Sequence, residues 1–166
     1  MILRKLTEFL NGKSIKYTVI THSEAFTARE IATIAHIPGK ELAKTVLIKL
    51  DGKMTMAVVP ASEMIDFKQL KRVMESKHAD LATEAEFKDL FPECEVGAMP
   101  PFGNLFDLNV LVTESIALDE EIVFNAGTHR ELIRMKYSDF EQLVKPTILR
   151  FSVKKKTHDE EKLLYE

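Results

Sequence analysis

Two apolar segments joined by a tight turn place the strongest constraint on how this chain folds. Residues 44–50 and 53–59 are rich in valine, isoleucine, leucine and methionine, and Asp51-Gly52 separates them. This dipeptide tolerates the positive φ angles that a two-residue hairpin turn requires. The pattern therefore predicts an antiparallel β-hairpin over 44–59.

Apolar spacing and capping residues predict the helices. Apolar residues at intervals of three and four precede Gly12 and indicate a helix over 3–11. Three Ser/Thr-x-x-Glu patterns have the spacing of a capping box, in which the two side chains satisfy free N–H groups of the first turn. They begin at Thr27, Thr83 and Ser138 and predict helices over 28–36, 83–90 and 138–144, and Asp66 caps a fourth over 67–74.

Short β-branched segments indicate further strands at 17–20, 110–113, 122–125 and 132–135. Because helices and strands interleave irregularly around one hairpin, we expect an α/β (α+β) fold, a single compact domain with a mixed sheet flanked by helices. A chain of 166 residues suits one domain. We place that domain at 1–146 and expect 147–166, with its adjacent basic and acidic runs, to be a flexible or loosely docked tail.

Composition excludes several classes of protein. The 26 acidic and 23 basic side chains give a net charge of −3, which argues against non-specific coating of nucleic acid but allows a local basic patch. Cys94 is the single cysteine, so no intrachain disulfide and no multi-cysteine metal site can form. We see no secretion signal and no apolar run of membrane-spanning length, and we expect a cytoplasmic protein with no membrane partner.

Common catalytic motifs are absent. The six glycines match neither GxGxxG nor a phosphate-binding P-loop, and the sequence contains no GxSxG and no HExxH. The five histidines are too scattered to read as a metal cluster, so we predict neither a metal nor a cofactor. Glu93 and Glu95 flank Cys94 and oppose thiolate formation, which favours a structural cysteine.

Three segments carry residues suited to a functional site. Lys44 shares one strand face with Val46, Ile48 and Leu50, which puts an amine at the rim of buried space, unless it simply extends into solvent. The segment Gly97-Ala98-Met99-Pro100-Pro101-Phe102-Gly103 can present its N–H groups rigidly to an oxyanion, or can be a stiff connection. The segment 125–130, Asn-Ala-Gly-Thr-His-Arg, can contact a polar ligand, or can be a hairpin turn with a polar tip.

Taken together, these segments resemble a known family. Ala43-Lys44-Thr45-Val46-Leu47, the Gly97–Gly103 loop, and Ala126-Gly127-Thr128-His129-Arg130 followed by Ser138-Asp139-Phe140 stand in the order seen in the YbaK/prolyl-tRNA synthetase-associated domain family. Residues 27–32 on the early helix also resemble that family, and the resemblance covers about residues 1–145. Pro100-Pro101 departs from the Ser-Pro of many members, and His129 stands where the cysteine-editing branch often has a different basic residue.

The resemblance implies a YbaK-like aminoacyl-tRNA deacylase that cleaves the ester of mischarged tRNA apart from the synthetase. It assigns the essential lysine to Lys44, the loop role to Gly97, Ala98 and Pro100, and the turn role to Gly127, Thr128 and His129. We expect Lys44 to bind the terminal nucleotide, the Gly97 and Ala98 amides to face the oxyanion, Met99 to line the substrate site, and water to attack. We place a pocket for a small side chain, alanine first, between the early helix and the hairpin, bounded by Phe26, Thr27, Ile31 and Ile34.

Two other functions remain open. A binding module could recognise tRNA or an aminoacyl group without turnover, and a regulatory interaction domain would have no affinity for tRNA. The expected partner is the 3′ acceptor end of a mischarged tRNA, with an aminoacyl-tRNA synthetase as a second candidate. The edited amino acid, the preferred tRNA and the oligomeric state do not follow from the sequence.

Overall fold

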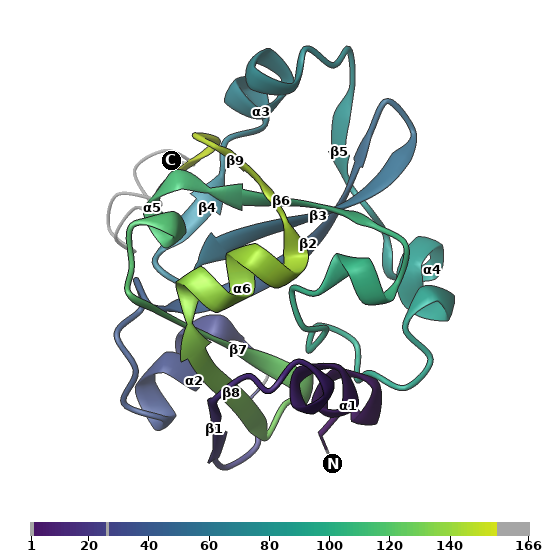
Figure 1. Ribbon diagram of the computed structural model, residues 1–166. Coiled ribbons are helices and arrows are strands. Elements are labelled where there is room, and N and C mark those ends of the chain that lie inside the picture. The colour runs from purple at the N-terminus through teal and green to yellow at the C-terminus, as the bar shows by residue number, and fades with distance from the viewer. Residues whose placement is uncertain (1, 26, 156–166) are drawn as a thin grey trace.

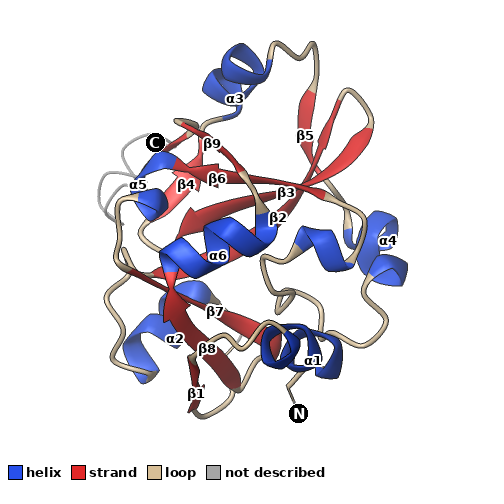
Figure 2. Cartoon of the chain, in the orientation of Figure 1, coloured by secondary structure: helices blue, strands red, loops and turns tan. Residues whose placement is uncertain are grey.

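The fold is built on one mixed β-sheet with helices on both faces (Figures 1 and 2). The structure, a computed structural model, describes residues 2–25 and 27–155. Within them the main sheet has eight strands in the order β1-β8-β7-β2-β3-β6-β9, with β5 paired to β2, and β10 pairs with β4 in a separate two-stranded sheet. The strands are β1 Tyr17–Thr21, β2 Leu42–Leu50, β3 Lys53–Pro60, β4 Glu63–Ile65, β5 Ala79–Leu81, β6 Asn109–Thr113, β7 Glu121–Thr128, β8 Glu131–Lys136, β9 Thr147–Leu149 and β10 Ser152–Lys154.

The helices are short and cover the sheet from both sides. They are α1 Arg4–Gly12, α2 Ala28–Ile34, α3 Phe67–Met74, α4 Glu84–Phe87, α5 Glu114–Ala117 and α6 Tyr137–Val144, with 3-10 turns at Lys88–Leu90 and Gly103–Leu105. Of the helices in the described part of the chain, none is both long enough and apolar enough to cross a membrane.

Strand alternation divides the core between the two faces. On β2, Ala43 and Leu47 join the main cluster with α1 and α6, and α6 runs across this face in Figure 1. Leu42 joins a second cluster with Ile31 of α2, and Ile48 joins a third with Leu70 of α3. Lys44 therefore lies on the face covered by α2 and α3, as its spacing from Ile48 predicts.

The predicted hairpin is confirmed, since β2 pairs antiparallel with β3 from Ala43–Pro60 to Leu50–Lys53. Thr27 and Thr83 accept the backbone N–H of the residue three positions on, as a capping box requires. The third capping box is wrong, because α6 begins at Tyr137, one residue before Ser138, and has no side-chain cap.

Residues 147–154 differ from the loose tail that the sequence suggests. Strand β9 pairs in parallel with β6, and β10 pairs antiparallel with β4. Phe151, between them, is fully buried in the cluster beneath α3. Isolated three-residue strands carry almost no periodicity, so their pairing is not visible in the sequence. The remainder of the expected tail, 156–166, lies outside the described residues.

Candidate functional site

Lys44 lies at a fork in the sheet. One edge of β2 pairs with β7 at Leu42 and Ala43 and then with β5 from Ile48 to Leu50. Among the described strands, none therefore lies beside this edge around residues 44–46. The Leu47 carbonyl and the Asp51 N–H both form hydrogen bonds on the side of β2 that faces β5. By alternation, the backbone groups of Thr45 point into the same opening.

The Lys44 side chain is half-buried in an apolar setting. It borders a pocket of about 220 Å³. The other lining residues are Val46, Met64, Ile65, Phe67 and Leu81. Burial, and after it the positive charge of Lys155, lowers the pKa of Lys44 from 10.5 to about 8. The ammonium form therefore still predominates at neutral pH.

The loop that begins at Gly97 is fastened to the end of β7. The N–H of Glu95 donates to the Gly127 carbonyl (2.9 Å), and the N–H of Gly127 donates to the Ala98 carbonyl (3.0 Å). Gly127 has φ +100°, and a Cβ there would lie 2.9 Å from the Cβ of Leu3, so a side chain does not fit. The sequence-predicted loop and turn are thus in direct contact.

His129 holds this loop from the other side. Its Nε2 lies 2.7 Å from the Val96 carbonyl, and because a carbonyl only accepts, Nε2 is the protonated nitrogen and Nδ1 is the acceptor in the neutral ring. The backbone N–H of His129 donates to the Glu95 carboxylate at 2.9 Å. His129 is only 4% exposed, so its ring supports the loop from within.

The structure corrects two expectations about the loop amides and side chains. The Ala98 N–H donates to the Glu95 carbonyl (3.0 Å), so it is not free to face an oxyanion. Met99 and Pro100 are buried, with Met99 in the main core cluster, so these side chains pack behind the loop. Gly97 is exposed, and within the described residues its N–H has no hydrogen-bond acceptor.

The other predicted pocket residues fall at different depths. Ile31 is buried against Leu42 and Val123, whereas Ile34 is 39% exposed. Thr27 caps α2, and the buried Thr128 donates to Glu131 at 3.3 Å. Phe26 lies outside the described residues. The structure therefore brings α2 and Lys44 to one face of the sheet, and Gly97, Gly127 and His129 to the end of β7.

Asn125 belongs to the polar segment 125–130 but was not assigned a role of its own from the sequence. Ala43 and Phe124 form the last residue pair between β2 and β7. Lys44 and Asn125 directly follow this pair. Asn125 is 8% exposed, and its Oδ1 has no hydrogen-bond partner within the described residues. A buried unpaired amide oxygen is unusual in proteins, and this one lies next to the fork. The only sequence signal was a polar residue inside an apolar strand.

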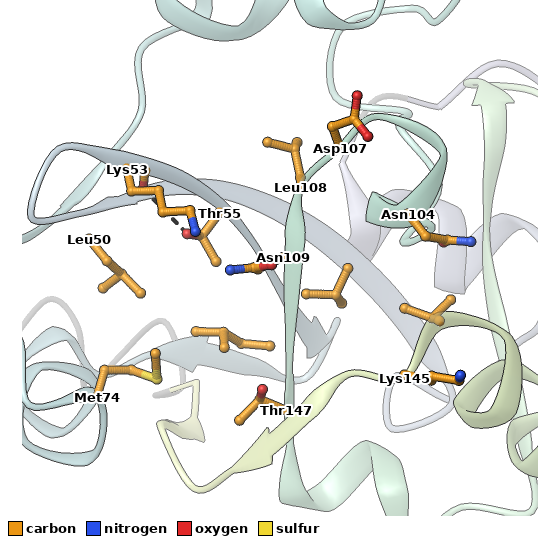
Figure 3. Close-up of a pocket in the computed structure, with 13 residues that line it drawn as sticks. Leu50, Lys53, Thr55, Met74, Asn104, Asp107, Leu108, Asn109, Lys145 and Thr147 are labelled. Atoms are coloured by element: carbon orange, nitrogen blue, oxygen red, sulfur yellow. Dashed lines mark hydrogen bonds between the residues drawn. The ribbon is translucent and has the colours of Figure 1, made fainter.

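A larger cavity lies elsewhere on the molecule. Its volume is about 620 Å³. Lys53, Asn109 and Thr147 are among the residues that line it (Figure 3). None of the predicted site residues lines it. It borders the β3, β6 and β9 side of the sheet, so it does not belong to the fork beside Lys44.

Thiol chemistry depends on Cys94, and metal binding depends on clusters of ligating side chains. Burial, with Glu93 second, raises the pKa of the Cys94 thiol to about 11, so the thiol is protonated at neutral pH. No group of three or more His, Cys, Asp or Glu side chains positioned to hold a metal ion occurs in 2–25 or 27–155.

Comparison with known proteins gives three kinds of match. Residues 22–143 match the model of a protein family described as "Aminoacyl-tRNA editing domain". The multifunctional Ser/Thr-tRNA deacylase ProXp-y of Escherichia coli (strain K12) is 26% identical over 154 residues, which cover 89% of this chain and 91% of that protein. Proline--tRNA ligase of Bacillus mycoides (strain KBAB4) is 25% identical over 88 residues, 53% of this chain but 15% of the ligase.

Solved structures show the same fold. The crystal structure of a candidate trans-editing enzyme for prolyl tRNA synthetase superposes with a TM-score of 0.75 at 19% identity, covering 92% of this chain and 96% of that one. The structure of hypothetical protein APE2540 gives a TM-score of 0.80 at 16% identity, with coverage of 90% and 100%.

Proposed function

Because this chain belongs to the aminoacyl-tRNA editing domain family, we propose that it is an aminoacyl-tRNA deacylase that hydrolyses mischarged tRNA in trans. The observation that carries this proposal is the family match over 22–143, a range that contains Lys44, Gly97 and His129. The E. coli relative is named a Ser/Thr-tRNA deacylase, and this chain spans 91% of it.

The reaction needs positioned water and charge stabilisation but no covalent intermediate. Water attacks the ester carbonyl carbon, the bond to the terminal ribose oxygen breaks, and the tRNA leaves as an alcohol after taking a proton. An aminoacyl ester is already activated, so orientation and oxyanion stabilisation can supply the catalysis. The absence of a triad motif and the protonated Cys94 thiol agree with such a site.

The Gly97 N–H takes the oxyanion role in this proposal. Gly97 is an exposed residue of the loop whose N–H has no acceptor in the described part of the chain, whereas the Ala98 N–H donates to the Glu95 carbonyl. The backbone hydrogen bonds of the loop with Gly127, and the hydrogen bond from His129 to the Val96 carbonyl, hold the loop in place. They therefore orient the Gly97 N–H before substrate binds. Such prior orientation is what makes an oxyanion donor effective.

Lys44 binds the tRNA end in this proposal. Its amine stands at the fork in the sheet, with a pKa of about 8 that keeps it mainly charged at neutral pH. A half-buried cation attracts a phosphate more strongly than one in bulk water does, because the lower dielectric screens the attraction less. The 3′ end of the tRNA is therefore the expected partner.

A panel of mischarged tRNAs tests the proposal. We propose small side chains as substrates and offer Ser-, Thr- and Ala-tRNA to the pure protein, following release of each amino acid over time. Release that depends on Lys44 supports deacylation. Binding of tRNA with no release of any amino acid would instead indicate a binding module, and no affinity for tRNA would indicate an unrelated interaction domain.

A further inference from the structure

A second lysine, in the C-terminal part of the chain, lies near the Lys44 pocket. Strand β10 runs antiparallel to β4, and the N–H of Lys155, just after β10, donates to the Ser62 carbonyl at 3.0 Å. Met64 and Ile65 of β4 line the pocket beside Lys44. The β4–β10 pair therefore places the Lys155 backbone just beyond the part of β4 that lines the pocket, and the positive charge of Lys155 acts on Lys44.

A partly buried hydrogen-bond network holds β10 in this place. The Ser152 hydroxyl donates to one oxygen of the Glu63 carboxylate (2.7 Å), and the Ser115 hydroxyl donates to the other (2.8 Å). Thr113 is hydrogen-bonded to Ser152. The strand that positions Lys155 is thus tied to β6, α5 and β4, and the Glu63 carboxylate is already occupied by hydroxyl donors.

Within residues 2–25 and 27–155, no ion pair joins either lysine of this cationic pair to a carboxylate. Acidic groups on the elements around Lys44 are Glu63, which accepts from two hydroxyls, Asp66, which caps α3, and Asp80 on β5. Their combined effect does not outweigh burial and Lys155, because the pKa of Lys44 is lowered. Two neighbouring ammonium groups repel each other. An anion bound between them attracts both groups and offsets this repulsion.

We propose that Lys155 and Lys44 together bind a phosphate of the tRNA 3′ end, so that the C-terminal strand completes the substrate site. The inference rests on the proposed function for the identity of the anion. It adds a residue that lies beyond the family match, which ends at residue 143. Lys155 is a binding residue here and takes no part in the bond-breaking step.

Salt-dependent binding of a short single-stranded RNA ending in CCA tests this pairing directly. Each phosphate contact to single-stranded RNA contributes about 0.7 to the slope of log K against log salt, so Lys155→Ala should lower the magnitude of that slope by about 0.7. Lys155→Arg should retain it. Lys154→Ala is the matched control, because Lys154 precedes Lys155 and lines a different cavity, beside Glu114 and Arg150.

Deacylation kinetics supply a second readout. Lys155→Ala should raise KM about fivefold, the scale of a partly exposed ion pair, with kcat nearly unchanged. Loss of the like charge should also raise the pKa of Lys44, so the rise of KM at alkaline pH should begin at higher pH than in the parent. A merely structural role for Lys155 would move neither the salt slope nor this pH limb.

The outcomes separate the two proposals. If Lys155→Ala keeps the parent slope and KM, or if Lys154→Ala changes them equally, the pairing of Lys155 with Lys44 is wrong even where deacylation is active. If the parent binds the RNA with a slope that depends on Lys155 but releases no amino acid from any tRNA, the proposed function fails while the phosphate site stands.

Discussion

The half-buried ammonium group of Lys44 costs folding free energy at neutral pH, because burial disfavours its charged form. We expect Lys44→Met to stabilise the fold by about 1–3 kcal/mol at pH 7 while it abolishes deacylation. Methionine fits the apolar pocket and carries no charge. Urea unfolding of the parent and the variant measures the difference.

The stability difference between the parent and Lys44→Met should depend on pH. The pKa of Lys44 is about 8 in the folded protein, against 10.5 for an unperturbed lysine, so between these values the unfolded chain binds more protons. Parent stability relative to Lys44→Met should therefore rise from pH 8 to 10.5, and the gap between them should narrow. A gap that stays constant over this range would mean that Lys44 is not buried as described.

Gly97 and Gly52 allow backbone strain to be separated from catalysis. Both have positive φ, +86° and +84°, and a Cβ at Gly52 meets nothing within 4 Å. Alanine at either position should cost about 1 kcal/mol of stability. Only Gly97→Ala should lower kcat, on the order of 100-fold, because it turns the oxyanion donor. Equal kcat values for the two variants would remove Gly97 from the mechanism.

The turn between β7 and β8 acts as a support for the loop that precedes β6. His129→Ala removes the donor to the Val96 carbonyl and should lower kcat about tenfold with little change in KM, as expected for a positioning residue. His129→Gln, whose amide N–H can donate to the same carbonyl, should recover part of the loss. A change in KM alone would indicate that His129 contacts substrate directly.

Local sequence signals predicted the elements that local chemistry determines. Asp51-Gly52 specified the β2–β3 turn, and Thr27 and Thr83 form the caps that their spacing indicates. Ser138 lies inside α6, because the preceding strand β8 already runs to Lys136 and the helix starts directly from it. The three-residue strands escaped prediction, since they are held by partners distant in the sequence.

At the scale of the molecule, the site depends on pairings that no local pattern encodes. The alternation within β2 correctly predicted the face of Lys44, but the fork arises because β7 and β5 share one edge of that strand. The hydrogen bond between His129 and the Val96 carbonyl joins segments more than thirty residues apart. Occupation of the Ala98 amide is local by contrast, since it closes a turn from Glu95 to Ala98.

The C-terminal strands also contribute to stability through contacts with residues distant in the sequence. Phe151 is fully buried against Leu70 and Leu111, so Phe151→Ala should lower the free energy of unfolding by about 3–5 kcal/mol. Val153 is 44% exposed on β10, and Val153→Ala serves as the control with a change under about 1 kcal/mol. Urea unfolding midpoints compare the two.

A shortened chain that ends at Pro146 tests how much the C-terminal strands contribute to the stability of the whole molecule. It lacks β9, β10 and Phe151, and it exposes both the β6 edge and the cluster beneath α3. We therefore expect it to unfold at much lower urea than the full chain, and to lose RNA binding with its structure. If the shortened chain kept the parent midpoint, 147–155 would be an appendage, and Lys155 could not be held beside Lys44 by the fold.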